Sequence, residues 1–251
     1  MNPQMLYTNT VISEEWVFVK IKAIKGLDEI REIVKVSMEE SKSVIEMFDV
    51  FDEKMIKIGI DSRENVHAKG LWHQTFQCWI VNHTISEGGS FLFQLRHKDK
   101  DTYPGLLDIS CAGHLQAGEV VDDGVRELQE ELGITVSIDE LTYCGMIAEE
   151  NFISTEIMDR EFNHVFIHES NNNLEDYAFQ KDEISGLYFV NMKEFQRLLN
   201  GKIDTILIEG IVMDEVLQTV RPDQRKVQGS DFTPNSYEYY QLIFNKIDSL
   251  L

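Results

Sequence analysis

Three glutamates near the middle of the chain are spaced to share one face of a short helix. Residues 126–134 read RELQEELGI, and two leucines four positions apart mark the buried side of a helical pattern. The glutamates stand at positions i, i+3 and i+4, so their carboxylates lie on one surface: Glu127, Glu130 and Glu131. Clustered carboxylates suit Mg²⁺, a hard cation that prefers oxygen ligands. Such a cation polarises phosphate groups and lowers the pKa of an attacking water.

A helix of this kind needs a framework that holds it beside a substrate. The apolar stretch at 107–114 predicts a strand that runs directly into the glutamate segment. Further strands are expected at 75–82, 91–95, 141–148, 162–168 and 187–190, with helical patterns at 192–199 and 204–220. A polar loop at 222–234 precedes a last helix capped by Asn235 or Ser236.

We expect a main domain at residues 45–200 with an addition at each end. Residues 1–44 predict a small strand at 17–24 and a helix at 27–38. Residues 201–251 predict a helical extension that packs on the main domain. Either addition is a candidate homodimer interface.

The composition favours a cytoplasmic globular protein. The chain has 251 residues, of which 43% are hydrophobic, so it can bury a sizeable core. No apolar run approaches the roughly 20 residues that span a bilayer, and the N-terminal sequence lacks the pattern of a secretion signal. The three cysteines form no CxxC pair, which favours reduced thiols over a zinc site.

The net charge of −21 restricts the partners of the protein. With 44 acidic against 23 basic residues, the chain would repel an extended nucleic acid. A small anionic substrate is compatible with this charge if divalent cations and a few bases reverse the local sign. Arg96 and Lys98 lie in the densest basic stretch before the acidic helix and are candidate phosphate contacts; the alternative is a solvated strand end.

Residues 113–134 resemble the Nudix box, the signature of the Nudix hydrolases. The matching pattern is Gly113, five residues, Glu119, and then Arg-Glu, an aliphatic residue, any residue, Glu-Glu, any residue, Gly and an aliphatic residue. One departure is that residues 120–125 supply six positions where the family has seven. RELQEEL alone is more often a solvated helix face, but the glycines, Glu119 and the preceding strand reverse that interpretation.

The resemblance implies the fold and the roles of the box residues. The expected fold is an α/β/α sandwich around a mixed sheet. The three helix glutamates would hold metal, Arg126 would orient Glu119, and Gly113 would permit a tight turn.

Residues 46–190 also resemble the Nudix proteins related to isopentenyl-diphosphate isomerases. In those isomerases three histidines and two later glutamates hold a metal, and His67, His73 and His114 stand at comparable places. Glu161 matches the second of the later glutamates. The alternatives for the histidines are ordinary hydrogen bonding, or donation to phosphate or a base ring.

Two departures argue against isomerisation. The catalytic cysteine of the isomerases directly precedes Gly-His, but Ala112 occupies that place and Cys111 lies one residue earlier. A one-residue shift on a strand turns the side chain to the opposite face. Asp159 replaces the first later glutamate and has a shorter reach.

The sequence therefore predicts a Mg²⁺-dependent pyrophosphohydrolase, with Mn²⁺ as a substitute cation. Its substrate would be a nucleoside diphosphate linked to another moiety. The proposed catalytic residues are Arg126, Glu130, Glu131 and Glu161. Glu161 is the first candidate for the general base, and Glu149, Glu150 and Glu183 are the alternatives. The proposed substrate contacts are Arg96, Lys98, Gly113 and His114. The alternatives are an isopentenyl-diphosphate isomerase and a non-catalytic nucleotide sensor.

Overall fold

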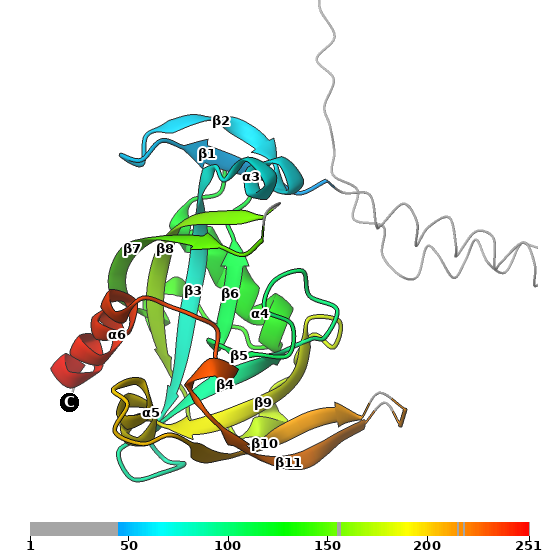
Figure 1. Ribbon diagram of the computed structural model, residues 1–251, viewed down its shortest axis with the longest axis vertical. Coiled ribbons are helices and arrows are strands. Elements are labelled where there is room, and N and C mark those ends of the chain that lie inside the picture. The colour runs from blue at the N-terminus through cyan, green and yellow to red at the C-terminus, as the bar shows by residue number, and fades with distance from the viewer. Residues whose placement is uncertain (1–44, 155–156, 215, 218, 251) are drawn as a thin grey trace, which may run out of the picture. The chain divides into compact units, whose positions relative to one another are not determined.

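The computed structural model describes residues 45–154, 157–214, 216–217 and 219–250. Glu46–Leu251 forms one compact unit. The strand expected at 17–24 and the helix at 27–38 lie outside the described residues. In chain order the elements are β1 (Met47–Phe51), β2 (Lys57–Ser62), α3 (Arg63–Lys69), β3 (Trp72–Asn82), β4 (Ser90–Arg96), β5 (Leu107–Asp108), β6 (Cys111–His114), the 3₁₀ helix η1 (Val121–Val125), α4 (Arg126–Leu132), β7 (Thr142–Phe152), β8 (Met158–Glu169), β9 (Ile184–Asn191), α5 (Met192–Leu199), β10 (Ile206–Asp214), β11 (Thr219–Val227) and α6 (Tyr237–Leu250) (Figure 1).

The strands form a mixed sheet, as the sequence predicts. Along its main path the strand order is β11-β10-β9-β4-β3-β1-β2, while β8 pairs with β3 and with β7. β3 and β8 are the only parallel pair among the described strands. This pairing places residues 72–81 beside residues 160–169 in register.

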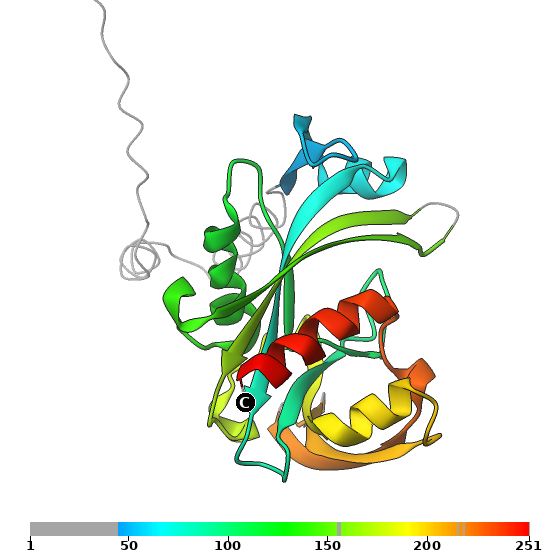
Figure 2. The ribbon, with the colours of Figure 1, turned by 90° about the vertical axis from the view of Figure 1, so that its left-hand side faces the viewer.

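Helices cover both faces of the sheet, which confirms the expected sandwich. Figure 2 shows α4 and α6 on opposite sides of β3. Leu128 and Leu132 of α4 pack in one buried core with Phe76 of β3. Alternate β3 residues such as Trp79 face the other core, which holds Phe195 of α5 and buried residues of α6.

β3 and β4 separate soon after they pair, and this divergence opens the sheet. They remain paired only at Val81–Phe91 and Asn82–Ser90. Beyond that point β3 continues with β6 and β8, whereas β4 continues with β5 and β9. Side chains from both arms line a cavity at this opening.

The helix predicted at 204–220 is wrong, because this segment forms the hairpin of β10 and β11. Ile206 and Ile208 are buried while Leu207 and Glu209 are exposed, which is the period of a strand. The polar loop predicted at 222–234 is also partly wrong, since β11 extends to Val227. The final helix does form as predicted, and Ser236 accepts a hydrogen bond from the backbone N–H of Tyr239.

The β1–β2 hairpin and the short helix α3 bring a histidine to the open end of β3. Ser62 caps the N-terminus of α3, and Gly70 ends the helix in the left-handed conformation with φ of 60°. This short helix carries His67 toward β3. Phe48 of β1 stacks on the ring of His114 at a centroid distance of 4.7 Å.

Candidate active site

The glutamate helix α4 is shorter than the sequence pattern suggested and begins at Arg126. Leu128 and Leu132 are fully buried, which fixes the rotation of the helix about its axis. That rotation leaves Glu127 and Glu131 almost buried, whereas the side chain of Glu130 is 54% exposed. All three carboxylates line the same cavity.

Arg126 joins the loop to the helix. Its Nε donates to Glu119 Oε1 at 2.8 Å and its Nη2 donates to Glu119 Oε2 at 2.9 Å, so the two side chains form a bidentate ion pair. Its Nη1 donates to Glu127 Oε1 at 2.6 Å and to Glu130 Oε2 at 2.9 Å. The guanidinium therefore contacts three carboxylates and neutralises part of their mutual repulsion.

The six-residue spacing between Glu119 and Arg126 does not separate the two side chains. Residues 121–125 form the 3₁₀ helix η1, whose rise per residue of about 2.0 Å exceeds the 1.5 Å of an α-helix. The tighter winding spans the gap with one residue fewer. Gly124 lies against β3, since an added Cβ would stand 2.4 Å from Phe76 Cβ.

Gly113 is required where the sequence pattern places it. A Cβ at this position would stand 2.0 Å from Glu127 Cδ, so any larger residue would displace that carboxylate. The glycine thus lets α4 lie close to the edge of β6.

Burial changes the acidity of two helix carboxylates. Burial raises the pKa of Glu131 to about 8, and the neighbouring Glu127 adds to the shift. Burial likewise raises the pKa of Glu127 to about 7, against the opposing effect of Arg126. Glu131 accepts hydrogen bonds from Ala112 N at 3.3 Å and Gln94 Nε2 at 3.4 Å. A cation that bound these two carboxyls would displace their protons to solvent, because only the ionised carboxylates are ligands.

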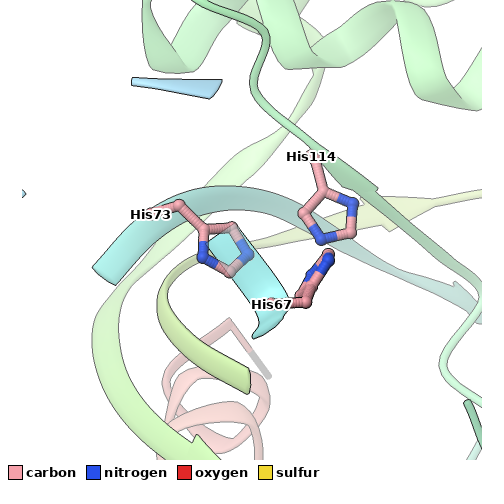
Figure 3. A group of neighbouring side chains, drawn as sticks. All are labelled: His67, His73 and His114. Atoms are coloured by element: carbon pink, nitrogen blue, oxygen red, sulfur yellow. The ribbon is translucent and has the colours of Figure 1, made fainter. Parts of the chain in front are cut away.

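A second cluster of metal-ligand side chains lies beside this helix. His67 of α3, His73 of β3 and His114 of β6 point their rings toward one another (Figure 3), with one nitrogen of each ring within 4.8 Å of the others. Asp159 and Glu161 of β8 join His73 in an overlapping group of the same size. Parallel pairing of β3 with β8 produces this arrangement by placing residue 161 beside residue 73.

Buried polar atoms of this cluster lack partners among the described residues. His73 Nε2, His114 Nε2 and Asp159 Oδ1 are shielded from solvent and make no hydrogen bond there. Asp159 Oδ1 lies 3.5 Å from His73 Nε2 and 3.6 Å from His67 Nε2. Burial lowers the pKa of His73 to about 4, so its ring is neutral and has a lone pair for a metal. Unpaired buried donors and acceptors are costly, and a shared cation would satisfy them.

The cavity that joins both clusters has a volume of about 570 Å³ and is strongly acidic. Twelve carboxylate side chains and four arginine or lysine side chains line it. A diphosphate would be repelled from such walls unless cations occupied it.

Of the two basic residues predicted to contact phosphate, Arg96 lines this cavity and Lys98 does not. Arg96 lines it, but its guanidinium bonds to Asp108 Oδ2 at 2.6 Å and to the hydroxyl and carbonyl of Thr102. Lys98 is exposed and is not among the described residues that line the cavity. Lys100, which pairs with Glu183, lines the cavity instead.

Arg63 and Asp159 are site residues whose placement the sequence pattern missed. Arg63 begins α3 and lines the cavity with Glu46, to which its Nη1 donates at 2.8 Å. Asp159, which has a shorter reach than the glutamate of the isomerases, lies with its Oδ1 3.5 Å from His73 Nε2, because β8 pairs in parallel with β3. The only sequence signal for Arg63 was its position four residues before His67.

Cys111 and Ala112 occupy opposite faces of β6, as the strand argument predicted. Cys111 is fully buried in the core beneath α4, and burial raises the pKa of its thiol well above the usual value. Ala112 lines the cavity. No thiol is therefore found at this position of the described site.

The sandwich, with a Gly-x₅-Glu loop and an Arg-Glu-x-x-Glu-Glu helix at the opening of its sheet, defines a Nudix protein. Residues 73–208 match the family model described as NUDIX domain, and the chain belongs to this family.

A bacterial relative supports this assignment. The chain is 41% identical over 204 residues to an uncharacterised Nudix hydrolase of Clostridium acetobutylicum, covering 80% of this chain and 97% of the relative. It is 25% identical over 185 residues to isopentenyl-diphosphate Δ-isomerase 2 of Photorhabdus laumondii, covering 72% and 99%. A solved structure from Deinococcus radiodurans aligns with a TM-score of 0.47 and 22% identity, covering 62% and 90%. The protein is an enzyme of the hydrolase class that acts on diphosphate bonds. No helix among the described residues is long and apolar enough to cross a membrane.

Proposed function

We propose that the protein is a Mg²⁺-dependent pyrophosphohydrolase that cleaves a nucleoside diphosphate linked to another moiety, with Mn²⁺ as a substitute cation. The observation that carries this proposal is the bidentate ion pair of Arg126 with Glu119, which fixes the loop after β6 against the helix α4 that carries the three glutamates. Glu127, Glu130 and Glu131 are the residues that would hold the cation, because all three line one cavity with oxygen ligands.

A divalent cation at this position supplies charge neutralisation for the diphosphate and lowers the pKa of an attacking water. The residues of the chain orient and exchange protons around it. Arg126 fixes the direction of Glu127, and Gly113 leaves room for that carboxylate. Glu161 is our candidate general base, since it is a half-buried carboxylate in the same cavity, 3.5 Å from His114 Nε2.

We propose a second cation site formed by His67, His73, His114 and Asp159. Its support is the convergence of three imidazoles and the unpaired buried atoms there. Imidazole ligands favour first-row transition metals, whereas an all-carboxylate site favours Mg²⁺. The two sites would therefore prefer different cations.

Isopentenyl-diphosphate isomerisation is the second candidate, because the histidine cluster is the feature that the isomerases share with this chain. Against it, Ala112 lines the cavity where the isomerases carry cysteine, and Cys111 is buried in the core. An acid or base for moving a double bond would have to come from another side chain.

The test is incubation of the purified protein with Mg²⁺ or Mn²⁺, a panel of nucleotide pyrophosphates and isopentenyl diphosphate. We expect phosphate-ester products without double-bond migration. Glu131→Gln should lower kcat at least about 100-fold, which is about 2.7 kcal/mol of transition-state stabilisation. Glu87→Gln, on an exposed turn, is the matched control and should leave kcat unchanged. Near-normal turnover by Glu131→Gln, or migration of the double bond, would contradict the proposal.

A further inference from the structure

One face of β3 changes in chemistry along its length. Alternate residues His73, Thr75, Gln77 and Trp79 share this face, since strand side chains alternate. His73 belongs to the histidine cluster, and Trp79 lies in the apolar core. Between them, Thr75 and Gln77 line the cavity as buried polar side chains, 3% and 7% exposed. Neither residue has a role in the catalytic proposal.

A chain of hydrogen bonds fixes the orientation of the Gln77 amide. The indole N–H of Trp79 donates to the hydroxyl oxygen of Tyr239 at 3.0 Å. Tyr239 then donates its own proton to Gln77 Oε1 at 2.6 Å. An indole N–H only donates and an amide oxygen only accepts, so the direction of both bonds is determined. Because the Gln77 oxygen is occupied by Tyr239, the group that Gln77 offers to a cavity ligand is its NH₂.

A second chain of hydrogen bonds fixes Asn163 beside Thr75. The Thr75 hydroxyl donates to Asn163 Oδ1 at 2.7 Å, and Asn163 Nδ2 donates to Glu149 Oε2 at 3.1 Å. The backbone N–H of Ser236 holds the other oxygen of Glu149 at 2.8 Å. With its oxygen engaged, Asn163 also has an N–H to offer. These donors are held in place by the core and by the start of α6.

The remainder of the cavity wall offers little apolar surface. Ile109, Ala112 and Pro234 are the only aliphatic side chains among the described residues that line it. Thr233 and Asn235, from the segment before α6, add polar groups. An apolar chain bound here would remove the amide donors from water without replacing their hydrogen bonds.

This inference rests on the proposed pyrophosphohydrolase function. We propose that Gln77, Thr75 and Asn163 form a subsite for a hydroxyl-bearing group joined to the nucleoside diphosphate, so that the substrate class is a nucleoside diphosphate sugar. An isoprenoid or alkyl group is excluded. Sites built to hydrogen-bond a substrate oxygen discriminate strongly against analogues that lack it.

The test compares substrates that differ only in this group. Purified full-length protein with Mg²⁺ is given ADP-ribose, UDP-glucose and GDP-mannose, and the pentyl esters of ADP, UDP and GDP. We expect at least one sugar to exceed its matched pentyl ester by about 100-fold or more in kcat/KM. Equal or better hydrolysis of the pentyl ester would overturn the subsite proposal and leave the hydrolase intact.

Variants separate recognition by the amide from a purely structural role. Gln77→Leu should raise KM for the preferred sugar at least about tenfold and leave KM for the pentyl ester unchanged or lower. Tyr239→Phe, which removes the bond that orients Gln77, should raise the same KM by a smaller factor. Tyr188→Phe is the control, because that buried hydroxyl bonds to Asp223 and does not line the cavity. An unchanged sugar KM in Gln77→Leu would contradict the proposal.

Calorimetric binding keeps the two proposals distinguishable. If wild-type protein hydrolyses none of the six probes, the pyrophosphohydrolase proposal fails. Tighter binding of a sugar than of its pentyl ester would then still support the subsite, and equal binding would overturn it as well.

Discussion

Arg126 connects the loop and the helix of the site through a single side chain. Lysine could not replace it, because the planar guanidinium contacts both oxygens of Glu119 while also reaching Glu127 and Glu130. The pKa of Arg126 lies above its usual value because of the bond to Glu119, so the charge persists at every working pH. As a consequence, the carboxylates of Glu119, Glu127 and Glu130 are held in place by Arg126 before any cation binds.

The histidine cluster leads to a prediction at the scale of one residue. His67→Gln should remove one Mn²⁺ from the stoichiometry measured by equilibrium dialysis, because it deletes one of the converging imidazoles. Glutamine is close in size, so the fold should persist. The control His83→Gln changes an exposed histidine on the turn after β3 and should leave the stoichiometry as in the wild type. Two bound Mn²⁺ in His67→Gln would show that this cluster does not hold metal.

At the scale of elements, the 3₁₀ helix η1 lets six residues separate Glu119 from Arg126 where the Nudix pattern has seven. Gly124→Ala would bring a Cβ to 2.4 Å from Phe76 Cβ and push η1 away from β3. We expect a loss of about 1–3 kcal/mol in the free energy of unfolding, measured by urea denaturation. Gly59→Ala, where the added Cβ meets nothing within 4 Å, is the control and should change stability little. Equal stability of the two variants would contradict the close packing of η1.

The elements also show what the sequence pattern can and cannot predict. The glutamate helix was correct, because turn residues and short apolar runs act locally. The single strand predicted at 107–114 was correct only in part, since it is divided into β5, which pairs with β4, and β6, which pairs with β3. The helix predicted at 204–220 was wrong, since the isoleucines of this segment fit both helical and strand spacing. Pairing with β9, a distant segment of the chain, stabilises the strand. Asp159 joins His73 only through the parallel pairing of β8 with β3, a contact between distant segments. Local periodicity carries no information about such a contact, nor about whether Lys98 or Lys100 turns inward.

At the scale of the whole molecule, the metal-free site should make stability depend on pH. The pKa values of Glu127 and Glu131 are raised to about 7 and about 8, from 4.5, so the folded protein holds protons that the unfolded chain releases. Stability therefore falls as pH rises toward 8. The lowered pKa values of His67, His73 and His114 act in the opposite direction, but only below their unfolded value of 6.5.

The measurable window lies between about pH 6.5 and pH 8. With a chelator present, we expect the free energy of unfolding to fall by on the order of 1–2 kcal/mol across it. Mg²⁺ should restore more stability at pH 8 than at pH 6.5, because the ligands must be deprotonated to bind it. The double change Glu127→Gln and Glu131→Gln should reduce the slope of the chelator profile, and the raised pKa of Glu161, caused by burial, should keep the remaining slope. A flat profile in the wild-type protein would contradict the raised pKa values.

Hydrogen bonds from Ser236 and from Tyr239 of α6 hold Glu149 and Gln77, which form the floor of the cavity, and these bonds have a consequence for biosynthesis. Tyr239 orients Gln77, and the backbone of Ser236 holds Glu149, although both partners lie far earlier in the chain. A nascent chain can pair β3 with β8 and form the box helix while still attached to the ribosome. Its cavity floor is complete only after Tyr239 has left the exit tunnel. The proposed sugar subsite therefore cannot form before Tyr239 has been synthesised and released, and a message truncated before that codon would yield a Nudix sheet without this subsite.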